Sequence, residues 1–236
     1  MFNLLNIFSS TRSRAKNKRT VLTILAGQSN CGVYNYLELP DKAESVFCWN
    51  VNTSKIDTVV STEQMLGKHV GPLVFLANGM KKKFPKDDLY FLQWHKTNTT
   101  LAKDWDINDP KSLFADLTRH LDALLKQMPK PDKIIFIWMQ GESDNCIPEF
   151  AAQYYEHEKE LFGMLSTRYS ISQIFNYQLS PWTARVRVHQ AKELHSRNNK
   201  KITLLKVPKT GYREDHIHLS IEGAKAFADS VLNRLR

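Results

Sequence analysis

Short apolar runs and helical patterns alternate along the chain from residue 20 to its end. Apolar runs of this length, bounded by polar residues, are typical of buried strands. Strands that alternate with helices are typical of a parallel sheet covered by helices. We therefore predict an α/β fold with five core strands, at residues 21–25, 88–92, 133–138, 174–177 and 202–205.

The stretches between these runs predict five helices, at residues 72–83, 112–127, 148–169, 184–196 and 221–235. The second has leucines at helical spacing on one stripe, at positions 113, 117, 121 and 124. The last follows Ser220, a favoured N-cap residue, and has Glu222 in its first turn, where the helix dipole favours negative charge. Residues 41–62 are less regular, and we expect a small hairpin there.

Polar clusters follow four of the five predicted strands. Ser29 follows the first strand, residues 96–100 the second, residues 140–144 the third, and the segment 215–218 the fifth. Ligands of open parallel sheets bind at the carboxyl ends of the strands. We therefore expect the four clusters to meet at one edge of the sheet.

Ser29, Asp215 and His218 are the residue types of a serine hydrolase. A serine hydroxyl is a weak nucleophile at neutral pH, so it needs an imidazole to take its proton and a carboxylate to orient that imidazole. His216 is an alternative base, because alternation along an extended loop puts it on the same side as His218. Each residue also has a structural explanation: Ser29 suits a helix N-cap, and His218 is one of eight histidines. Their order along the chain favours the catalytic interpretation.

Attack on an ester creates an oxyanion, which needs preorganised hydrogen-bond donors. The candidate donors are the backbone N–H of Ser29, a backbone N–H at Asn98 or Thr99, and the side-chain amide of Gln140. Glu142 and Asp144 follow Gln140 closely. We expect these two carboxylates to brace the loops, because a histidine already fills the acid–base role.

The composition predicts one large domain, because the chain has 236 residues of which 42% are hydrophobic. Basic residues crowd positions 12–19, so we place a basic N-terminal arm at residues 1–19 and the domain at residues 20–236. The formal net charge is +9. No nucleic-acid-binding motif accompanies this charge, and we expect no nucleic-acid partner.

Several other chemistries lack their motifs. The three cysteines have no metal-type or disulfide-type spacing, and the chain has no phosphate loop, dinucleotide fingerprint or H-E-x-x-H motif. The turn at Ser29 lacks the second glycine of a nucleophile elbow. We expect a reaction without cofactor or metal. The apolar residues 1–8 precede the basic residues, unlike a signal peptide, and are too few to span a membrane; we assign neither a compartment nor an oligomeric state.

Four motifs occur in the order of one known family: Gly27-Gln28-Ser29-Asn30, Gly71-Pro72, Trp138-Met139-Gln140-Gly141-Glu142-Ser143-Asp144 and Asp215-His216-Ile217-His218-Leu219-Ser220. Over about residues 20–236 the chain resembles the SGNH hydrolases, specifically the sialate O-acetylesterase-like carbohydrate esterases. The resemblance implies a flavodoxin-like three-layer α/β/α sandwich around a five-stranded parallel sheet. It also implies metal-free removal of acetyl groups from the sugar hydroxyls of an O-acetylated glycan.

Carried over by position, the resemblance implies that Ser29 is the nucleophile, His218 the general base and Asp215 its orienting partner. Gln140 matches the residue that replaces the oxyanion-hole asparagine of other SGNH branches. Support of the loops is the role expected for Gln28, Asn30, Glu142 and Asp144.

One stretch departs from the family pattern. Relatives carry a Gly-Gly-Thr-like turn after the second strand, where this chain has Lys96-Thr97-Asn98-Thr99-Thr100-Leu101. Asn98 tolerates the left-handed conformation that glycine adopts, so we expect an oxyanion hole with an altered donor.

Two other functions are open on the sequence: a lipid or aryl esterase of the same superfamily, and a weakly catalytic glycan-binding tail or surface module. A sugar-stacking aromatic is a further expectation. Trp105 and Tyr212 lie nearest to the site loops along the chain, and we favour them over Trp49, Trp94 and Trp182.

Overall fold

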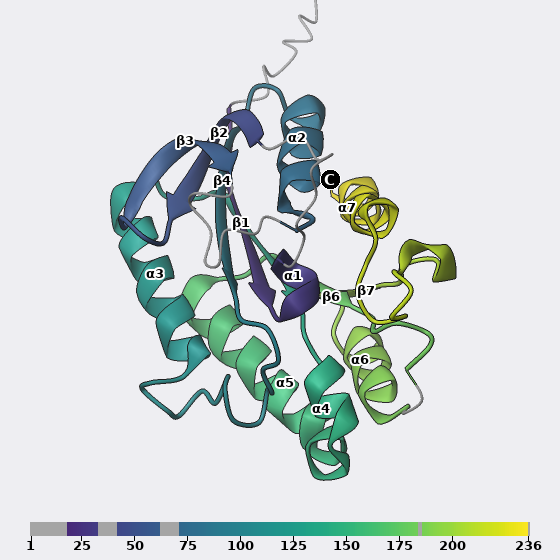
Figure 1. Ribbon diagram of the computed structural model, residues 1–236. Helices are drawn as coiled ribbons and strands as arrows, with labels where there is room; N and C mark the ends of the chain where they lie inside the picture. The colour runs from purple at the N-terminus through teal and green to yellow at the C-terminus, as the bar shows by residue number, and fades with distance from the viewer. Residues whose placement is uncertain (1–17, 33–41, 62–70, 184–185, 236) are drawn as a thin grey trace, which may run out of the picture.

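The computed structural model describes residues 18–32, 42–61, 71–183 and 186–235. Its centre is a seven-stranded sheet in the order β3-β2-β4-β1-β5-β6-β7 (Figure 1). The strands are β1 (Thr20–Gly27), β2 (Lys42–Asn50), β3 (Lys55–Ser61), β4 (Asp88–His95), β5 (Lys133–Met139), β6 (Gln173–Tyr177) and β7 (Ile202–Leu205). The predicted strands correspond to β1, β4, β5, β6 and β7, which pair in parallel.

The expectation of a five-stranded sheet is wrong, because the hairpin expected at residues 41–62 adds two strands. β2 lies parallel to β4, with Phe47 opposite Tyr90, and β3 lies antiparallel to β2 at the edge. The pairing of β2 with β3 shifts register between Glu44 and Cys48. Such a shift breaks the period-two alternation that marks a strand in a sequence.

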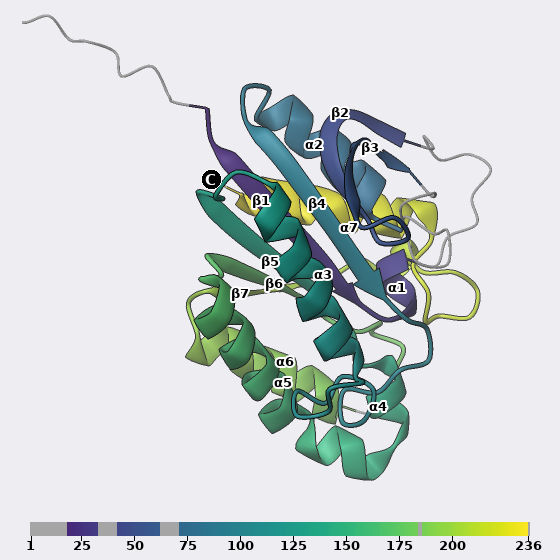
Figure 2. The same ribbon diagram turned by 90° about the vertical axis from the view of Figure 1, so that its left-hand side faces the viewer.

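Helices cover both faces of the sheet, which confirms the three-layer fold (Figure 2). One face carries α2 (Leu73–Lys83) and α7 (Ile221–Arg234), which pack together; the other carries α3 (Leu113–Gln127), α5 (Pro148–Tyr169) and α6 (Arg187–Asn198). Short helices α1 (Ser29–Gly32), α4 (Glu142–Cys146) and η3 (Lys209–Gly211) lie in the loops. The side chain of Ser220 caps α7 by accepting a hydrogen bond from the backbone N–H of Gly223 at 3.1 Å, as its position predicts.

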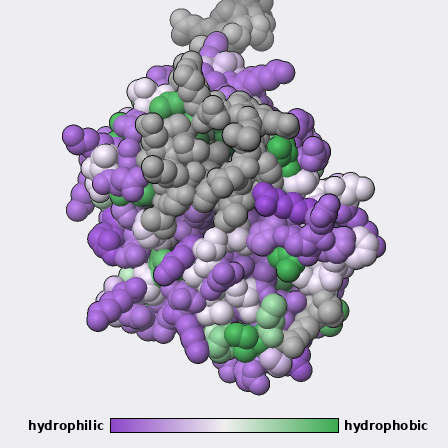
Figure 3. Space-filling view, in the orientation of Figure 1, coloured by the Kyte–Doolittle hydropathy of each residue, from purple (hydrophilic) through white to green (hydrophobic). Residues whose placement is uncertain are grey.

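Most of the predicted basic arm, residues 1–17, lies outside the described residues. Lys18 and Arg19 form ion pairs with Asp88 and Asp87 at the start of β4, with N···O distances of 2.8 and 2.6 Å. Within the described part of the chain, no helix combines the length and the apolar character that crossing a membrane requires. Outside the grey residues, the face in Figure 3 is mainly hydrophilic, with small apolar groups scattered over it.

The end of β1 positions the site. Gly27 pairs with His95 of β4 on one side and with Met139 of β5 on the other. It has φ +145°, and a Cβ at this position would lie 2.0 Å from the Met139 carbonyl oxygen. Only glycine fits both the conformation and the space. The chain therefore leaves β1 tightly against β5, and Ser29 follows at the sheet edge.

Candidate active site

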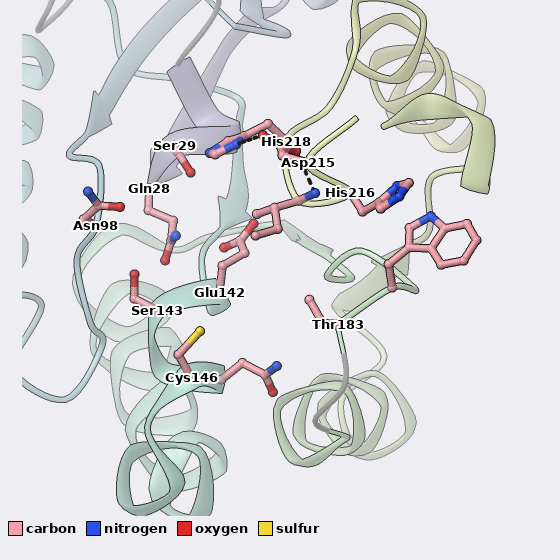
Figure 4. Close-up of a pocket in the computed structure, with 13 residues that line it drawn as sticks. Gln28, Ser29, Asn98, Glu142, Ser143, Cys146, Thr183, Asp215, His216 and His218 are labelled. Carbon is pink, nitrogen blue, oxygen red and sulfur yellow. Dashed lines mark hydrogen bonds and ion pairs between the residues drawn. The ribbon is translucent and has the colours of Figure 1, made fainter. Parts of the chain in front are cut away.

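The loops after five parallel strands surround one cavity of about 730 Å³. Its lining includes Gln28 and Ser29 after β1, Asn98 after β4, Glu142, Ser143, Asn145 and Cys146 after β5, Trp182 and Thr183 after β6, and residues 215–218 after β7 (Figure 4). The four predicted polar clusters thus meet at one edge. The loop after β6 is a fifth contributor.

His218 and Asp215 form a close pair in this cavity. Nδ1 of His218 donates to Oδ2 of Asp215 at 2.7 Å, and the backbone N–H groups of His218 and Ile217 donate to Oδ1 at 2.9 and 2.8 Å. Partial burial alone would raise the pKa of Asp215, but these hydrogen bonds outweigh it and lower the pKa to about 2. Asp215 is therefore an anion that fixes the imidazole with Nε2 free of the pair. Figure 4 shows that end of the ring facing Ser29.

His216 occupies a different position. It has φ +58°, and its ring packs on Trp182 with 4.9 Å between the ring centroids. The two histidines therefore point in different directions, although their alternation in sequence predicts the same side (Figure 4). His218 is the histidine that contacts the carboxylate of Asp215.

Asn30 connects the turn that carries Ser29 to the loop that carries His218. Its Oδ1 accepts the backbone N–H of Leu219 at 2.9 Å, and its Nδ2 lies 3.1 Å from the carbonyl oxygen of Ile217. The same Nδ2 donates to Oε1 of Glu142 at 2.6 Å. Asn30 therefore holds the residues on both sides of His218 and one residue of α4 against the turn that carries Ser29.

Glu142 is a buried acid at the wall of the cavity. The side chain is 7% exposed, and its Oε2 has no hydrogen-bond partner among the described residues. Burial raises the pKa of Glu142, although the hydrogen bond from Asn30 and the proximity of Lys192 and His218 act in the opposite direction.

Gln140 lies beneath the cavity and is absent from its lining. Its Nε2 contacts three acceptors: Oδ2 of Asp144 at 2.5 Å, the carbonyl of Thr99 at 3.1 Å and Oε1 of Gln28 at 3.3 Å. An amide has two hydrogens, so this arrangement leaves none for an oxyanion. Asp144 in turn accepts the backbone N–H of Leu101 at 2.9 Å. Gln140 and Asp144 thus join the loops after β4 and β5.

Gln28 and Asn98 lie in the cavity instead. Oε1 of Gln28 is within 3.4 Å of the backbone N–H of Gly141, and Figure 4 shows the amide nitrogen of Gln28 on the cavity side. Asn98 has φ +55°, the left-handed conformation expected for the residue that stands in place of the family's glycine.

The preferred aromatic candidates are wrong. Trp105 is fully buried, where its Nε1 donates to Thr99 at 3.2 Å and its ring packs edge-on against Trp138. Tyr212 hydrogen-bonds with Tyr177 at 3.2 Å and is absent from the cavity lining. The aromatic residue in the cavity is Trp182, which is 50% exposed. Its place in the loop after β6, at a carboxyl end of the sheet, is the signal in the sequence that identifies it.

A buried polar network supports Gln140 from below. The hydroxyl of Tyr154 contacts Oε1 of Gln140 at 2.9 Å and Oε1 of Glu158 at 3.1 Å. Lys192 donates to Glu158 at 3.0 Å and to Asn176 at 2.7 Å. Sequence reasoning missed this network, because Glu158 and Lys192 lie within helices, where charged residues usually face solvent.

The comparisons with known proteins agree with this fold. The family model for carbohydrate esterase, sialic acid-specific acetylesterase, matches residues 19–235. A structure from Arabidopsis thaliana is similar with 17% identity and a TM-score of 0.73, over 92% of this chain and 100% of that chain. The structure of NanS is similar with 14% identity and a TM-score of 0.72, over 92% of this chain and 96% of that chain.

A carbohydrate acetylesterase from Xanthomonas citri is similar with 11% identity and a TM-score of 0.59, over 91% of this chain and 55% of that chain. At such identities the solved structures support the SGNH-like fold alone. No curated protein matches the chain. Because the family model covers nearly the whole sequence, the chain belongs to the sialic acid-specific acetylesterase family of carbohydrate esterases.

Proposed function

We propose that the protein is a carbohydrate O-acetylesterase that works by a Ser-His-Asp mechanism. The observation that carries the proposal is the His218–Asp215 hydrogen bond of 2.7 Å in the cavity that Ser29 also lines. This arrangement supplies a hydroxyl, a base and the carboxylate that orients the base. Membership of a carbohydrate esterase family supports an acetylated sugar as the substrate.

In the proposed reaction, Oγ of Ser29 attacks the acetyl carbonyl while Nε2 of His218 takes the hydroxyl proton. Asp215 stabilises the imidazolium that forms. The tetrahedral intermediate collapses, the bond from the acyl carbon to the sugar oxygen breaks, and His218 returns the proton to that oxygen. A water molecule then attacks the acyl-serine while the same imidazole takes its proton. The bond from the acyl carbon to Oγ breaks, His218 returns the proton to Oγ of Ser29, and acetate leaves.

The oxyanion would be met by donors that face the cavity. We assign these to the backbone N–H of Ser29, the turn at Asn98 and the side-chain amide of Gln28. Gln28 takes this place because the hydrogens of Gln140 are already used within the loops. Gln140 then acts through Gln28, whose amide it orients.

Substitution of Ser29 tests the nucleophile. We expect Ser29→Ala to lower acetate release from an O-acetylated sialic acid or an acetylated polysaccharide at least about 1,000-fold, with the circular dichroism spectrum unchanged. Ser230→Ala, at a partly exposed position of α7, is the matched control and keeps full activity. Full activity of the Ser29 variant would refute the assignment.

Separate alanine variants of the two neighbouring histidines test the base. His218→Ala is expected to lose activity toward every acetate ester, whereas His216→Ala keeps activity toward small esters such as ethyl acetate. Faster cleavage of longer acyl chains than of acetyl would favour a lipid or aryl esterase instead. Glycan binding without acetate release from any substrate would favour a binding module.

A further inference from the structure

The cavity has an exposed aromatic edge that the proposed reaction leaves without a role. Large hydrophobic side chains are exposed at five positions of the described chain: Met164, Trp182, Val186, Leu194 and Ile217. Two of these, Trp182 at 50% and Ile217 at 42%, line the cavity. A half-exposed tryptophan at a cavity is a feature of ligand-binding surfaces. A tryptophan with no ligand to contact would stabilise the fold more if it were buried in the core.

The aromatic edge consists of Trp182 and His216, and it is held in place before any ligand arrives. Their ring centroids are 4.9 Å apart with 35° between the planes. Ser180 hydrogen-bonds to the carbonyl of His216 and accepts the backbone N–H of Trp182 at 3.3 Å. One hydroxyl therefore joins the loop after β6 to the loop that carries His218. A preformed surface loses little conformational entropy on binding.

The size of the cavity indicates what this edge contacts. An acetyl group has only three non-hydrogen atoms. The cavity volume of about 730 Å³ is typical of sites that bind much larger ligands. The remaining space extends from Ser29 toward the edge, since both ends line the same cavity. With the acetyl group at Ser29, the alcohol part of the ester is the part of the substrate that occupies this remaining space.

The chemistry of the edge suits a sugar ring. A pyranose has faces of C–H groups that pack on aromatic rings and hydroxyls that need polar partners. Trp182 and Ile217 supply apolar surface. Polar side chains in the same cavity lining include Ser143, Asn145 and Thr183.

We propose that Trp182 and His216 form the subsite for the sugar ring that leaves with the ester oxygen. The inference rests on the proposed esterase function and names the part of the cavity that selects a sugar over a simple alcohol. The subsite acts in binding, so its loss affects KM for sugar esters. It leaves the chemical step at Ser29 and His218 in place.

The test compares two acetate esters in one set of variants. For Trp182→Ala we expect kcat/KM for an O-acetylated monosaccharide to fall about tenfold, mainly through KM; tenfold corresponds to about 1.4 kcal/mol, which is within the range for one aromatic contact. The value for ethyl acetate, whose alcohol is too short to use the edge, stays within about twofold. Met164→Ala, which removes an exposed hydrophobic side chain outside the cavity, changes neither value. Equal losses for both esters, or no loss for the sugar ester, would overturn the proposal.

A binding measurement separates this inference from the catalytic one. Titration calorimetry of the Ser29→Ala protein with the same acetylated sugar reports binding without turnover. We expect Trp182→Ala, added to Ser29→Ala, to weaken this binding about tenfold, whether or not the wild-type protein cleaves the sugar ester. Unchanged affinity, or no binding of any acetylated sugar tested, contradicts the subsite.

Discussion

Asn30 accepts the backbone N–H of Leu219 at 2.9 Å, although 189 positions separate the two residues in the sequence. The contact is buried, and it joins the residue after the candidate nucleophile to the residue after the candidate base. Asn30 also contacts the carbonyl of Ile217 at 3.1 Å. The relative position of Ser29 and His218 therefore depends on a side chain outside the proposed triad.

Asn30→Ala should lower kcat strongly while the protein still folds. The variant removes the hydrogen bond from the buried N–H of Leu219 to Asn30, a loss of about 1–3 kcal/mol, and displacement of a catalytic group by about 1 Å costs about 100-fold in rate. We expect activity to fall about 100-fold, measured as acetate release. Asn30→Asp keeps the acceptor for Leu219 but loses both donated hydrogen bonds and adds a carboxylate beside Glu142. Its activity should therefore be lower than that of Asn30→Ala. Activity of Asn30→Ala near that of wild type would show that other contacts position His218.

Gln28→Ala tests whether Gln28, and not Gln140, donates to the oxyanion. Loss of one oxyanion donor typically lowers kcat about 100- to 1,000-fold, and we expect this for Gln28→Ala with KM little changed. Gln140→Ala should act through the loops, with a lower melting temperature as well as lower kcat, because its amide joins three loop groups. Gln153→Ala on the surface of α5 is the control. If Gln28→Ala loses stability without a specific loss of kcat, Gln28 is structural.

The core strands and the polar ends of those strands could be predicted from the sequence. Residues 21–26 of β1 form a nearly continuous buried run, and a run that is buried on both faces is visible without its partners. The position of Ser29 follows from the rule that ligands bind at carboxyl ends. The extra strands β2 and β3 could not be recognised in the same way, because their pairing contains a register shift.

The finer structure of the site depends on conformations that residue types do not determine. His216 adopts φ +58°, which breaks the alternation of an extended loop and so separates it from His218. The hydrogens of Gln140 are used because Asp144, Thr99 and Gln28 converge on them from three loops. Proximity along the chain favours Trp105 and Tyr212 over Trp182 as the sugar-stacking aromatic, because the sequence does not show that the loop after β6 turns Trp182 toward the cavity.

Glu142→Gln should change how stability depends on pH. Burial raises the pKa of Glu142 in the folded protein, so ionisation is easier in the unfolded chain. The wild type therefore loses stability as the pH rises from the unfolded pKa, about 4.3, through the higher folded pKa. Glutamine keeps the oxygen that accepts from Asn30 and cannot ionise. The melting temperature of Glu142→Gln relative to wild type should rise as the pH increases from about 4 and level off once the pH exceeds the folded pKa of Glu142.

Thermal unfolding followed across this pH range measures the effect. Glu160→Gln, at an exposed position of α5, is the matched control and should follow the wild-type curve. Parallel curves for wild type and Glu142→Gln would mean that Glu142 is ionised as readily in the fold as in the unfolded chain.

Lys192→Met should be the most destabilising of these variants. Lys192 and Glu158 are both fully buried, 3.0 Å apart, and Asn176 contacts both of them. Removal of one partner of a buried pair leaves an uncompensated charge and costs about 3–5 kcal/mol, or roughly 6–20 °C in melting temperature for a domain of this size. Lys159→Met, which breaks the exposed pair with Glu156, should change stability by less than about 1 kcal/mol.

The double variant Lys192→Met, Glu158→Gln shows whether the lone charge is the cause. It removes the buried carboxylate that Lys192→Met leaves without its lysine, so it should be more stable than Lys192→Met alone, with a coupling energy between the two changes. Tyr154 links Glu158 to Gln140, so Lys192→Met should also lower esterase activity. The double variant should then recover activity together with stability. If the double variant is no more stable than Lys192→Met, the lost stability comes from the packing of the lysine side chain and not from the buried charge.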